Sequence, residues 1–425
     1  MKVFLDMVGC RLNQSEIERI ASSLTADGGE VVADPEAADY IIVNTCCVTA
    51  KASADSRKMI RKYRRETGAK VISTGCWATV FTDEAADLVE PTLVFDNQSK
   101  DQIREYFKKT GSRSESKAVS EVKPALGHRS RTRSFIKIQD GCDNYCTYCL
   151  TRIARGPSRS IPAELVIADI SRVQELGGKE AVLTGVQLGS WGKDLRAESK
   201  LSQLLKSILE KTQIPRIRIS SIEPWDIDSA LLECWKNERL CPHLHIPLQS
   251  GSDEILHRMG RPTTGGNYRE LIAEIRQAVP EMAVTTDIMV GFPGETEELF
   301  KQSFEFVRSL GFSGGQVFKF SPMPGTAAAG FPNQVSTRIS AERSHKFLQL
   351  FQQAAVQKRN DMLGGIEPVL WENNENNPDK SVFSGCTRNF THVKTHSAED
   401  ISNKIKLVNL NELDASGNLF GTLIS

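Results

Sequence analysis

Hydrophobic positions in the first hundred residues alternate between short apolar runs and helical stripes. The apolar runs predict strands at Lys2–Met7, Tyr40–Val43 and Val71–Ile72. Between them, Ile17, Ile20 and Leu24 share one helical face that stops at Gly28, and a second helix is expected over Lys51–Arg65. Strands that alternate with helices favour an α/β fold, so we predict an open parallel sheet here.

The same alternation resumes at Ser134 and continues to about Phe320. Six strands are expected, at Phe135–Ile138, Ala181–Thr184, Arg216–Ile219, Leu244–Ile246, Val284–Val290 and Gln316–Phe320. Amphipathic helices lie between them, for example over Glu164–Leu176 and Leu299–Leu310. Six such repeats predict a parallel, partly open (β/α) barrel with its chemistry at the carboxyl ends of the strands.

The last sixty residues change character near Met362, where helical periodicity stops. Five short strand signals follow, at Pro368–Trp371, Ser381–Phe383, Thr391–Lys394, Ile405–Val408 and Leu419–Ile424. Turn clusters separate them, which predicts a small antiparallel β-barrel. Together with a Ser-, Lys-, Arg- and Gly-rich linker, the predicted organisation is 1–110, linker 111–133, 134–361 and 362–425.

Composition narrows the class of protein. The chain has 425 residues, 40% hydrophobic and 25% charged, which is ordinary for a globular protein of two or three domains. No apolar run is long enough to predict a membrane span, and the first residues carry no export-signal pattern, so we expect a cytoplasmic protein without a membrane partner. The ten cysteines then favour metal or redox chemistry over disulfides.

The formal net charge is zero, so nucleic-acid binding would depend on local basic patches. Two segments qualify, Arg57–Arg65 and His128–Arg133. Either can contact phosphates, and each is equally explained as a solvated helix face or a soluble linker.

Three cysteines, Cys142, Cys146 and Cys149, share one short loop after the strand at Phe135–Ile138. Closely spaced thiolates are typical ligands of iron–sulfur clusters or zinc. The next cysteine is Cys234, so the loop predicts a 4Fe-4S cluster held by three cysteines, with one iron left to bind a small molecule. A structural zinc knuckle and a chance grouping are the alternatives.

Three more cysteines, Cys10, Cys46 and Cys76, each follow a predicted strand. The carboxyl ends of parallel strands meet at one edge of a sheet, where ligands bind. Buried cysteine is also an ordinary small hydrophobe, but these three lie past the strand ends, so we predict a second metal site. Cys47 is expected to face the other way and to pack.

Several later strands of the predicted barrel end in residues suited to a nucleoside ligand. Gly185 follows the second strand and permits close backbone approach. Gln249 and Ser250 follow the fourth and offer hydrogen bonds to a ribose, and Asp287 and Gly291 lie at the end of the fifth. Each is a weak signal alone, because Gly and Pro mark any turn.

The spacing C-x3-C-x2-C resembles the signature of the radical S-adenosylmethionine enzymes. The resemblance implies a 4Fe-4S cluster whose free iron chelates the methionine amino and carboxylate groups of S-adenosylmethionine. An electron from the cluster then splits the sulfonium to give a 5′-deoxyadenosyl radical. It also implies that Tyr148 packs near the adenine and that Gly185 lies in the segment meeting the methionine amino group.

The segments Gly9–Gln14, Val43–Cys46 and Gly75-Cys76 resemble the N-terminal domain of the methylthiotransferases within that superfamily. The resemblance implies a second, auxiliary 4Fe-4S cluster on Cys10, Cys46 and Cys76, and the family often has threonine where Cys47 stands. Ser384–Thr391 resembles the core of a TRAM domain, an RNA-binding barrel. Arg388 would then contact phosphate and Phe390 would stack on a base; the alternative is a barrel used only for packing.

Val43–Thr49, Leu183–Gly192 and Cys142–Pro157 most resemble the branch acting on N6-threonylcarbamoyladenosine. The implied reaction replaces the adenine C2 hydrogen by a methylthio group at position 37, in the tRNA anticodon loop. It needs two molecules of S-adenosylmethionine, an external electron donor and a sulfur donor. The alternatives are the branches acting on isopentenyladenosine in tRNA or on a ribosomal-protein aspartate, and, from a different class, a non-catalytic iron–sulfur RNA-binding regulator. Three ligands in the loop favour turnover of S-adenosylmethionine over a regulator.

Overall fold

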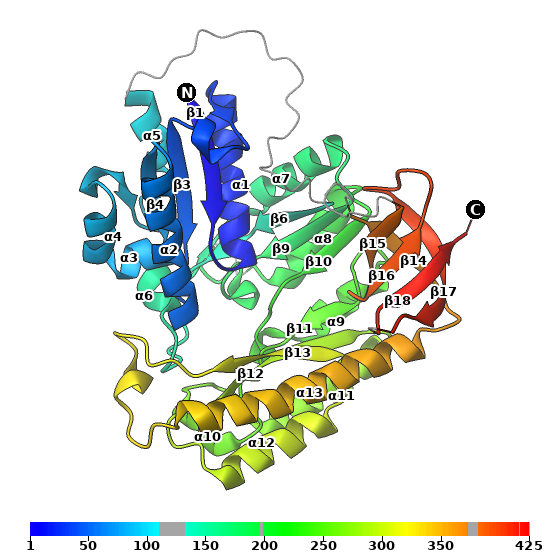
Figure 1. The fold of residues 1–425 in the computed structure, drawn as a ribbon. Coiled ribbons are helices and arrows are strands. Elements are labelled where there is room, and N and C mark those ends of the chain that lie inside the picture. Colours follow the sequence, from blue (N-terminus) through cyan, green and yellow to red (C-terminus); the bar gives the residue numbers. More distant parts are fainter. Residues whose placement is uncertain (110–131, 196–198, 373–380, 416, 425) are drawn as a thin grey trace. The chain divides into compact units, whose positions relative to one another are not determined.

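The computed structural model describes residues 1–109, 132–195, 199–372, 381–415 and 417–424 (Figure 1). They form two compact units. The first contains the N-terminal sheet, its helices, Asp140–Asn144 and Cys149–Pro157; the second contains the strand before the cysteine loop, Tyr145–Tyr148 and the described residues from Ser158 on. Most of the predicted linker, 111–133, lies outside the described residues. None of the described helices combines the length and hydrophobicity needed to cross a membrane.

The N-terminal unit is built on the predicted parallel sheet, which the structure confirms. Its order is β2-β1-β3-β4-β5, and every pair is parallel. The strands are β1 (Lys2–Met7), β2 (Glu30–Val31), β3 (Tyr40–Thr45), β4 (Lys70–Gly75) and β5 (Val94–Phe95). The helices are α1 (Arg11–Ala26), α2 (Ala50–Glu66), α3 (Cys76–Val80), α4 (Thr82–Leu88) and α5 (Gln102–Lys109).

Local sequence explains the two long helices of this unit. α1 ends before Gly28, whose φ of +84° suits a helix terminus. It buries Ile17 and Leu24 against the strand residues Val3 and Ile42. α2 begins at Thr49, whose hydroxyl accepts a hydrogen bond from the Ala52 N–H at 3.1 Å. Each helix therefore buries one apolar stripe against the sheet, and its opposite face is polar.

The central part of the second unit is the predicted half-barrel. Six parallel strands run in chain order, β6 (Arg133–Lys137), β9 (Glu180–Thr184), β10 (Arg216–Ile219), β11 (His243–His245), β12 (Ala283–Val290) and β13 (Gly314–Lys319). Isolated bridges, among them Ser221 to His245, join the two three-stranded sheets between β10 and β11. Among the described residues β13 does not pair with β6, which leaves the barrel open.

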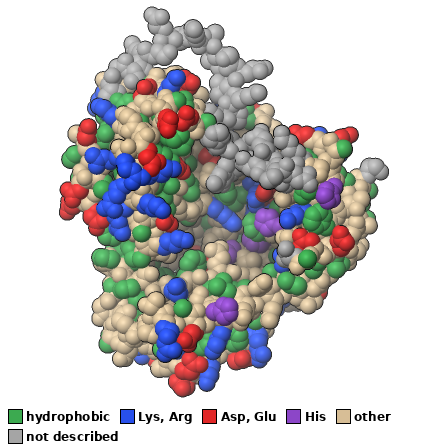
Figure 2. Space-filling view, viewed as in Figure 1, with side chains coloured by type: hydrophobic (Ala, Val, Ile, Leu, Met, Phe, Trp, Pro, Cys, Tyr) green, Lys and Arg blue, Asp and Glu red, His purple; other side chains and the backbone are tan. Residues whose placement is uncertain are grey.

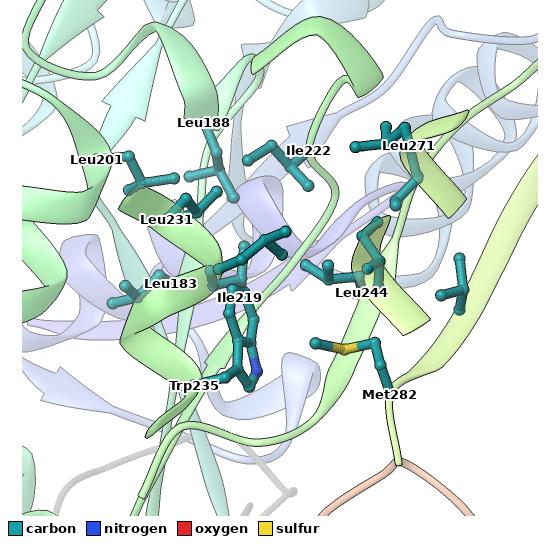
Figure 3. Close-up of a cluster of buried hydrophobic side chains, with 14 of the residues drawn as sticks. Leu183, Leu188, Leu201, Ile219, Ile222, Leu231, Trp235, Leu244, Leu271 and Met282 are labelled. Carbon is teal, nitrogen blue, oxygen red and sulfur yellow. The ribbon is translucent and has the colours of Figure 1, made fainter. Parts of the chain in front are cut away.

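Alternate residues of these strands form one hydrophobic core with the surrounding helices. Figure 3 shows Leu183, Ile219 and Leu244, from three successive strands, pointing toward Leu231 and Trp235. The helices are α7 (Ala163–Glu175), α8 (Leu201–Lys211), α9 (Ser229–Leu232), α10 (Asp253–Arg258), α11 (Gly265–Ala278) and α12 (Glu297–Ser309). Full burial of one such side chain stabilises the folded state by about 1.5–3 kcal/mol. The core therefore holds the strands, and with them the residues at their carboxyl ends, in place.

The long helix α13 (Thr337–Asp361) packs on β13 and leads into a closed five-stranded barrel. Its strands are β14 (Ile366–Trp371), β15 (Val382–Thr387), β16 (His392–His396), β17 (Ile405–Leu413) and β18 (Leu419–Leu423), closed in the order β14-β15-β16-β18-β17. This architecture is consistent with a TRAM domain. One detail differs from the prediction: β16 and β18 pair in parallel, while the other pairs are antiparallel.

Candidate functional site

A glycine with positive φ stands directly before a cysteine three times. The φ angles are +113° at Gly9, +99° at Gly75 and +71° at Gly141. Backbone of this kind favours glycine because a Cβ atom would clash. Each glycine lets the chain turn sharply where a strand ends. The residue after it therefore lies just past the carboxyl end of that strand; these residues are Cys10, Cys76 and Cys142.

The first set of cysteines lies at the ends of three neighbouring strands. Cys10 precedes α1 after β1, Cys46 follows β3, and Cys76 begins α3 after β4. Cys46 and Cys76 are buried, whereas Cys10 is exposed. Burial raises the pKa of Cys46 to about 12, and the neighbouring Cys76 and Cys10 thiols act in the same direction. Cys10 and Cys76 therefore each lie within electrostatic reach of Cys46.

Three thiols at one sheet edge are a donor set that fits an iron–sulfur cluster. In the described part of the chain, no three His, Cys, Asp or Glu side chains are already drawn together as a metal site. Each cysteine must lose its thiol proton to bind a metal, so metal binding and deprotonation are coupled. The ligand role of Cys10, Cys46 and Cys76 stays a prediction. Cys47 is fully buried, and burial raises the pKa of its thiol, as suits a packing residue.

Gly9 leaves the space that the Cys46 thiol occupies. A Cβ atom at position 9 would lie 2.6 Å from the Cys46 Cβ and 2.7 Å from its Sγ. We therefore expect Gly9→Ala to lower iron bound at the N-terminal site of anaerobically reconstituted protein by more than half. Gly68→Ala, where nothing lies within 4 Å, is the matched control. Full iron retention by Gly9→Ala would contradict this placement of Cys46.

The cysteine loop lies between the short strand β7 (Gln139–Asp140) and the helix α6 (Thr151–Arg155). The Cys142 N–H donates to the Gly156 carbonyl at 3.1 Å. Backbone N–H groups also point at sulfur: Asn144 donates to the Cys142 Sγ and Thr151 to the Cys149 Sγ, each at 3.4 Å. Hydrogen bonds of this kind stabilise thiolates, so this loop also fits an iron–sulfur cluster.

The middle of the loop is held by the half-barrel. The Thr147 N–H donates to the Met259 carbonyl at 2.9 Å, and its hydroxyl donates to the Arg258 carbonyl at 3.0 Å. These bonds hold Thr147, and so the backbone between Cys146 and Tyr148. The Tyr148 ring packs edge-on against Phe292 with centroids 6.5 Å apart, so the aromatic residue lies against the barrel wall.

Arg261 is a candidate that the sequence analysis missed. Its side chain is 1% exposed and pairs with Glu223 at 2.6 Å, and its guanidinium lies 4.9 Å from the Trp225 ring centroid. Burial lowers the pKa of Arg261, but Glu223, Tyr148 and Cys146 outweigh it and raise the pKa overall. A fixed cation therefore lies within electrostatic reach of Cys146 and Tyr148. An isolated arginine between a glycine and a proline carries no sequence signal for this role.

Gln249, in the segment after β11, lies beside Asp287 in the second half of β12. Gln249 has φ +73°, a strained backbone for a residue with a side chain, held by bonds from its N–H to the Asp287 carbonyl and from the Met289 N–H to its own carbonyl, both 2.8 Å. The Asp287 carboxylate lies 3.1 Å from the His245 ring. His245, which the sequence analysis did not single out, also contacts the Thr285 hydroxyl at 2.9 Å.

The remaining predicted cofactor residues make contacts within the chain. Gly185 packs on Gln139, whose side-chain oxygen accepts hydrogen bonds from the two backbone N–H groups after Gly185. Ser250 is fully buried, and its hydroxyl accepts from the Ser252 N–H at 3.2 Å. Gly291 packs against Ser340 of α13. Cofactor contacts by these residues stay predictions.

Phe390 is half-buried and contacts cationic and aromatic side chains of the half-barrel, and base stacking by its ring stays a prediction. The Arg218 and Arg133 guanidinium groups lie 4.9 Å and 5.4 Å from its ring centroid, and the His243 ring lies 4.8 Å away. Arg218 also donates to the Arg388 carbonyl at 2.9 Å. The loop between β15 and β16 therefore packs against the half-barrel, and its aromatic residue serves that packing.

The exposed face of α2 carries a basic stripe. Lys58, Arg61, Lys62 and Arg65 are exposed and recur at helical spacing. Figure 2 shows Lys and Arg side chains gathered over this helix. The other predicted basic segment, His128–Arg133, lies outside the described residues except for its last two. A stripe of this kind suits phosphate contacts.

The fold and the cysteine loop define a radical S-adenosylmethionine enzyme. Residues 136–307 match the family model of the radical SAM superfamily, and residues 2–96 match that of an uncharacterized protein family, UPF0004. A radical S-adenosylmethionine methyltransferase, TsrM from Kitasatospora setae, shares the fold with a TM-score of 0.56 at 14% identity, over 75% of this chain and 72% of that one.

Relatives identify the family. The threonylcarbamoyladenosine tRNA methylthiotransferase MtaB of Thermotoga maritima is 38% identical over 87% of this chain and 86% of its own length. The ribosomal protein uS12 methylthiotransferase RimO of Lachnoclostridium phytofermentans is 33% identical over 88% of both chains. The chain belongs to the radical S-adenosylmethionine methylthiotransferases.

Proposed function

We propose that this protein adds a methylthio group to C2 of N6-threonylcarbamoyladenosine at position 37 of tRNA. The observation that carries the proposal is the presence of two three-cysteine sets together with 38% identity to a threonylcarbamoyladenosine tRNA methylthiotransferase. The reaction needs both a radical generator and a sulfur site, and three ligands leave an open position at each.

The residues of the chain have separate tasks in this proposal. Cys142, Cys146 and Cys149 hold the cluster that cleaves S-adenosylmethionine, and Cys10, Cys46 and Cys76 hold the auxiliary cluster. When bound, these groups supply the radical and the sulfur chemistry, while the protein positions them. Tyr148, Gly185, Gln249, Ser250, Asp287 and Gly291 surround S-adenosylmethionine, and Arg261 adds a fixed positive charge near Tyr148. An external electron donor and a sulfur donor complete the turnover, in the cytoplasm.

An iron count tests the two-cluster part. Two clusters of four irons predict about eight irons per chain after anaerobic reconstitution. We expect the triple variant Cys10→Ala, Cys46→Ala, Cys76→Ala to hold about four. The control replaces Cys234, a buried cysteine outside both sets, and should hold about eight. If the unsubstituted protein binds no more than four irons, it holds a single cluster and the two-cluster proposal is wrong.

A competition assay tests the substrate. The purified enzyme receives tRNA bearing threonylcarbamoyladenosine, tRNA bearing isopentenyladenosine, and ribosomal protein uS12, and methylthio products are measured by mass spectrometry. We expect the first substrate to be modified at least tenfold faster. Preference for either other substrate would assign the protein to another branch of the family. One such branch includes the RimO relative, which is 33% identical to this chain. Absence of any S-adenosylmethionine cleavage would favour the iron–sulfur RNA-binding regulator.

An anticodon loop is single-stranded and already presents unstacked bases, so an enzyme can reach its target base there without opening a duplex. The proposed phosphate contacts are the α2 stripe and Lys394 on β16, which is partly exposed. A neutral protein with few such contacts should bind tRNA with a shallow dependence on salt.

A further inference from the structure

Asn97 is a buried residue that the proposed reaction leaves without a role. It follows β5, the strand next to β4, and is 8% exposed. Its backbone N–H donates to the Thr79 hydroxyl of α3 at 2.9 Å. α3 begins at Cys76, so this bond fixes Asn97 beside the proposed auxiliary site.

The Asn97 side chain makes two contacts with its amide nitrogen. It donates to the Cys76 Sγ at 3.6 Å and to the Ala154 carbonyl at 2.7 Å. Rotating the amide by half a turn would place its oxygen against the Ala154 carbonyl, which only accepts hydrogen bonds, so the second contact settles the orientation. The Asn97 Oδ1 is buried with no partner among the described residues. An amide N–H is therefore held toward the Cys76 sulfur.

A carbonyl at the end of α6 explains how Asn97 is held. Ala154 lies in the last turn of that helix, where carbonyl groups have no partner within the helix. Arg155, the next residue, is 2% exposed and donates to Glu16 at 2.8 Å, Asp140 at 2.9 Å and Asn13 at 2.9 Å. This network was not anticipated from the sequence, and it keeps the Ala154 carbonyl in place.

We infer that Asn97 hydrogen-bonds the cluster-ligating sulfur of Cys76 and so raises the reduction potential of the auxiliary cluster. The inference rests on the proposed function, because it needs the auxiliary cluster. Reduction adds negative charge to the cluster and its sulfur ligands. A donor held toward one of these sulfurs stabilises the reduced form more than the oxidised form. Asn97 is thus a positioning residue that acts through Cys76.

The test uses full-length protein carrying Cys142→Ala, Cys146→Ala and Cys149→Ala, which leaves only the auxiliary site. Its midpoint potential is measured by anaerobic redox titration with electron paramagnetic resonance, and iron is counted in parallel. Adding Asn97→Ala to this protein should shift the midpoint potential to a more negative value, while the protein still binds four irons. Asn97→Asp, of equal size, should shift it further in that direction because it removes the donor and adds negative charge. Gln98→Ala, at the exposed neighbouring position, should leave it unchanged.

Each result has one meaning. An unchanged or more positive midpoint in either Asn97 variant overturns the inference. Loss of iron from both variants assigns Asn97 a structural role and also overturns it. A parent protein that binds no cluster contradicts the two-cluster function itself, whereas a parent cluster with a potential insensitive to Asn97 contradicts only this inference.

Discussion

Cys149→Ala is expected to reduce the formation of 5′-deoxyadenosine from S-adenosylmethionine to the assay background. The substitution removes one of three ligands from the proposed radical-generating cluster, so the cluster is lost or is no longer held in the position that S-adenosylmethionine cleavage needs. Cys76→Ala, on the other cysteine set, should keep that cleavage and abolish methylthio transfer. The measurement is liquid chromatography of both products under anaerobic conditions with a chemical reductant.

Cys234→Ala is the control for this pair, because Cys234 is 4% exposed and belongs to neither set. It should keep both activities. Equal loss of cleavage in Cys149→Ala and Cys76→Ala would mean that the N-terminal cysteines are not a separate sulfur site.

Arg218→Met is expected to destabilise the second unit by about 3–5 kcal/mol. Arg218 and Glu180 are both 0% exposed, and the guanidinium donates to the Glu180 carboxylate at 2.8 Å and 3.2 Å. The coulombic attraction of Arg218 overcomes the effect of burial and lowers the pKa of Glu180. Removing the arginine leaves a buried carboxylate whose remaining ion pair among the described residues is with Arg216, at 3.9 Å.

Anaerobic urea denaturation followed by tryptophan fluorescence measures this effect. The double variant Arg218→Met, Glu180→Leu should recover much of the loss, because it removes both charges together. Arg239→Met, whose guanidinium donates to backbone carbonyls only, is a comparison without a carboxylate partner. Equal free energies of unfolding for the single and double variants would show that a buried Glu180 carboxylate without Arg218 does not destabilise the protein.

The same contacts affect how RNA binding should be studied. Arg216 donates to the Cys386 and Pro368 carbonyls of the small barrel, so deleting that barrel would expose buried cations of the half-barrel. Substitutions at exposed cations, such as Lys394 or the α2 stripe, separate RNA binding from this packing.

The order of strands and helices and the positions of the two cysteine sets could be predicted from the amino-acid sequence. The strands from Lys2–Met7 through Gln316–Phe320 follow from local hydrophobic period, and each lies within a few residues of its prediction. Cys142, Cys146 and Cys149 lie within eight consecutive residues, so their spacing alone indicates a shared cluster. The strand-end positions of Cys10, Cys46 and Cys76 could also be predicted, because in a parallel sheet all carboxyl ends lie at one edge.

The contacts of the polar residues around these cysteines could not be predicted in this way, because their partners lie far away in the sequence. Arg155 meets Glu16 across 139 positions and Arg218 meets the Arg388 carbonyl across 170. Phe390 has the local pattern of an exposed aromatic residue, but in the structure it is half-buried against Arg218, Arg133 and His243. A polar or aromatic residue has the same local pattern whether it is solvated or buried against a partner. Its role therefore depends on long-range packing, which hydrophobic period and motif spacing do not contain.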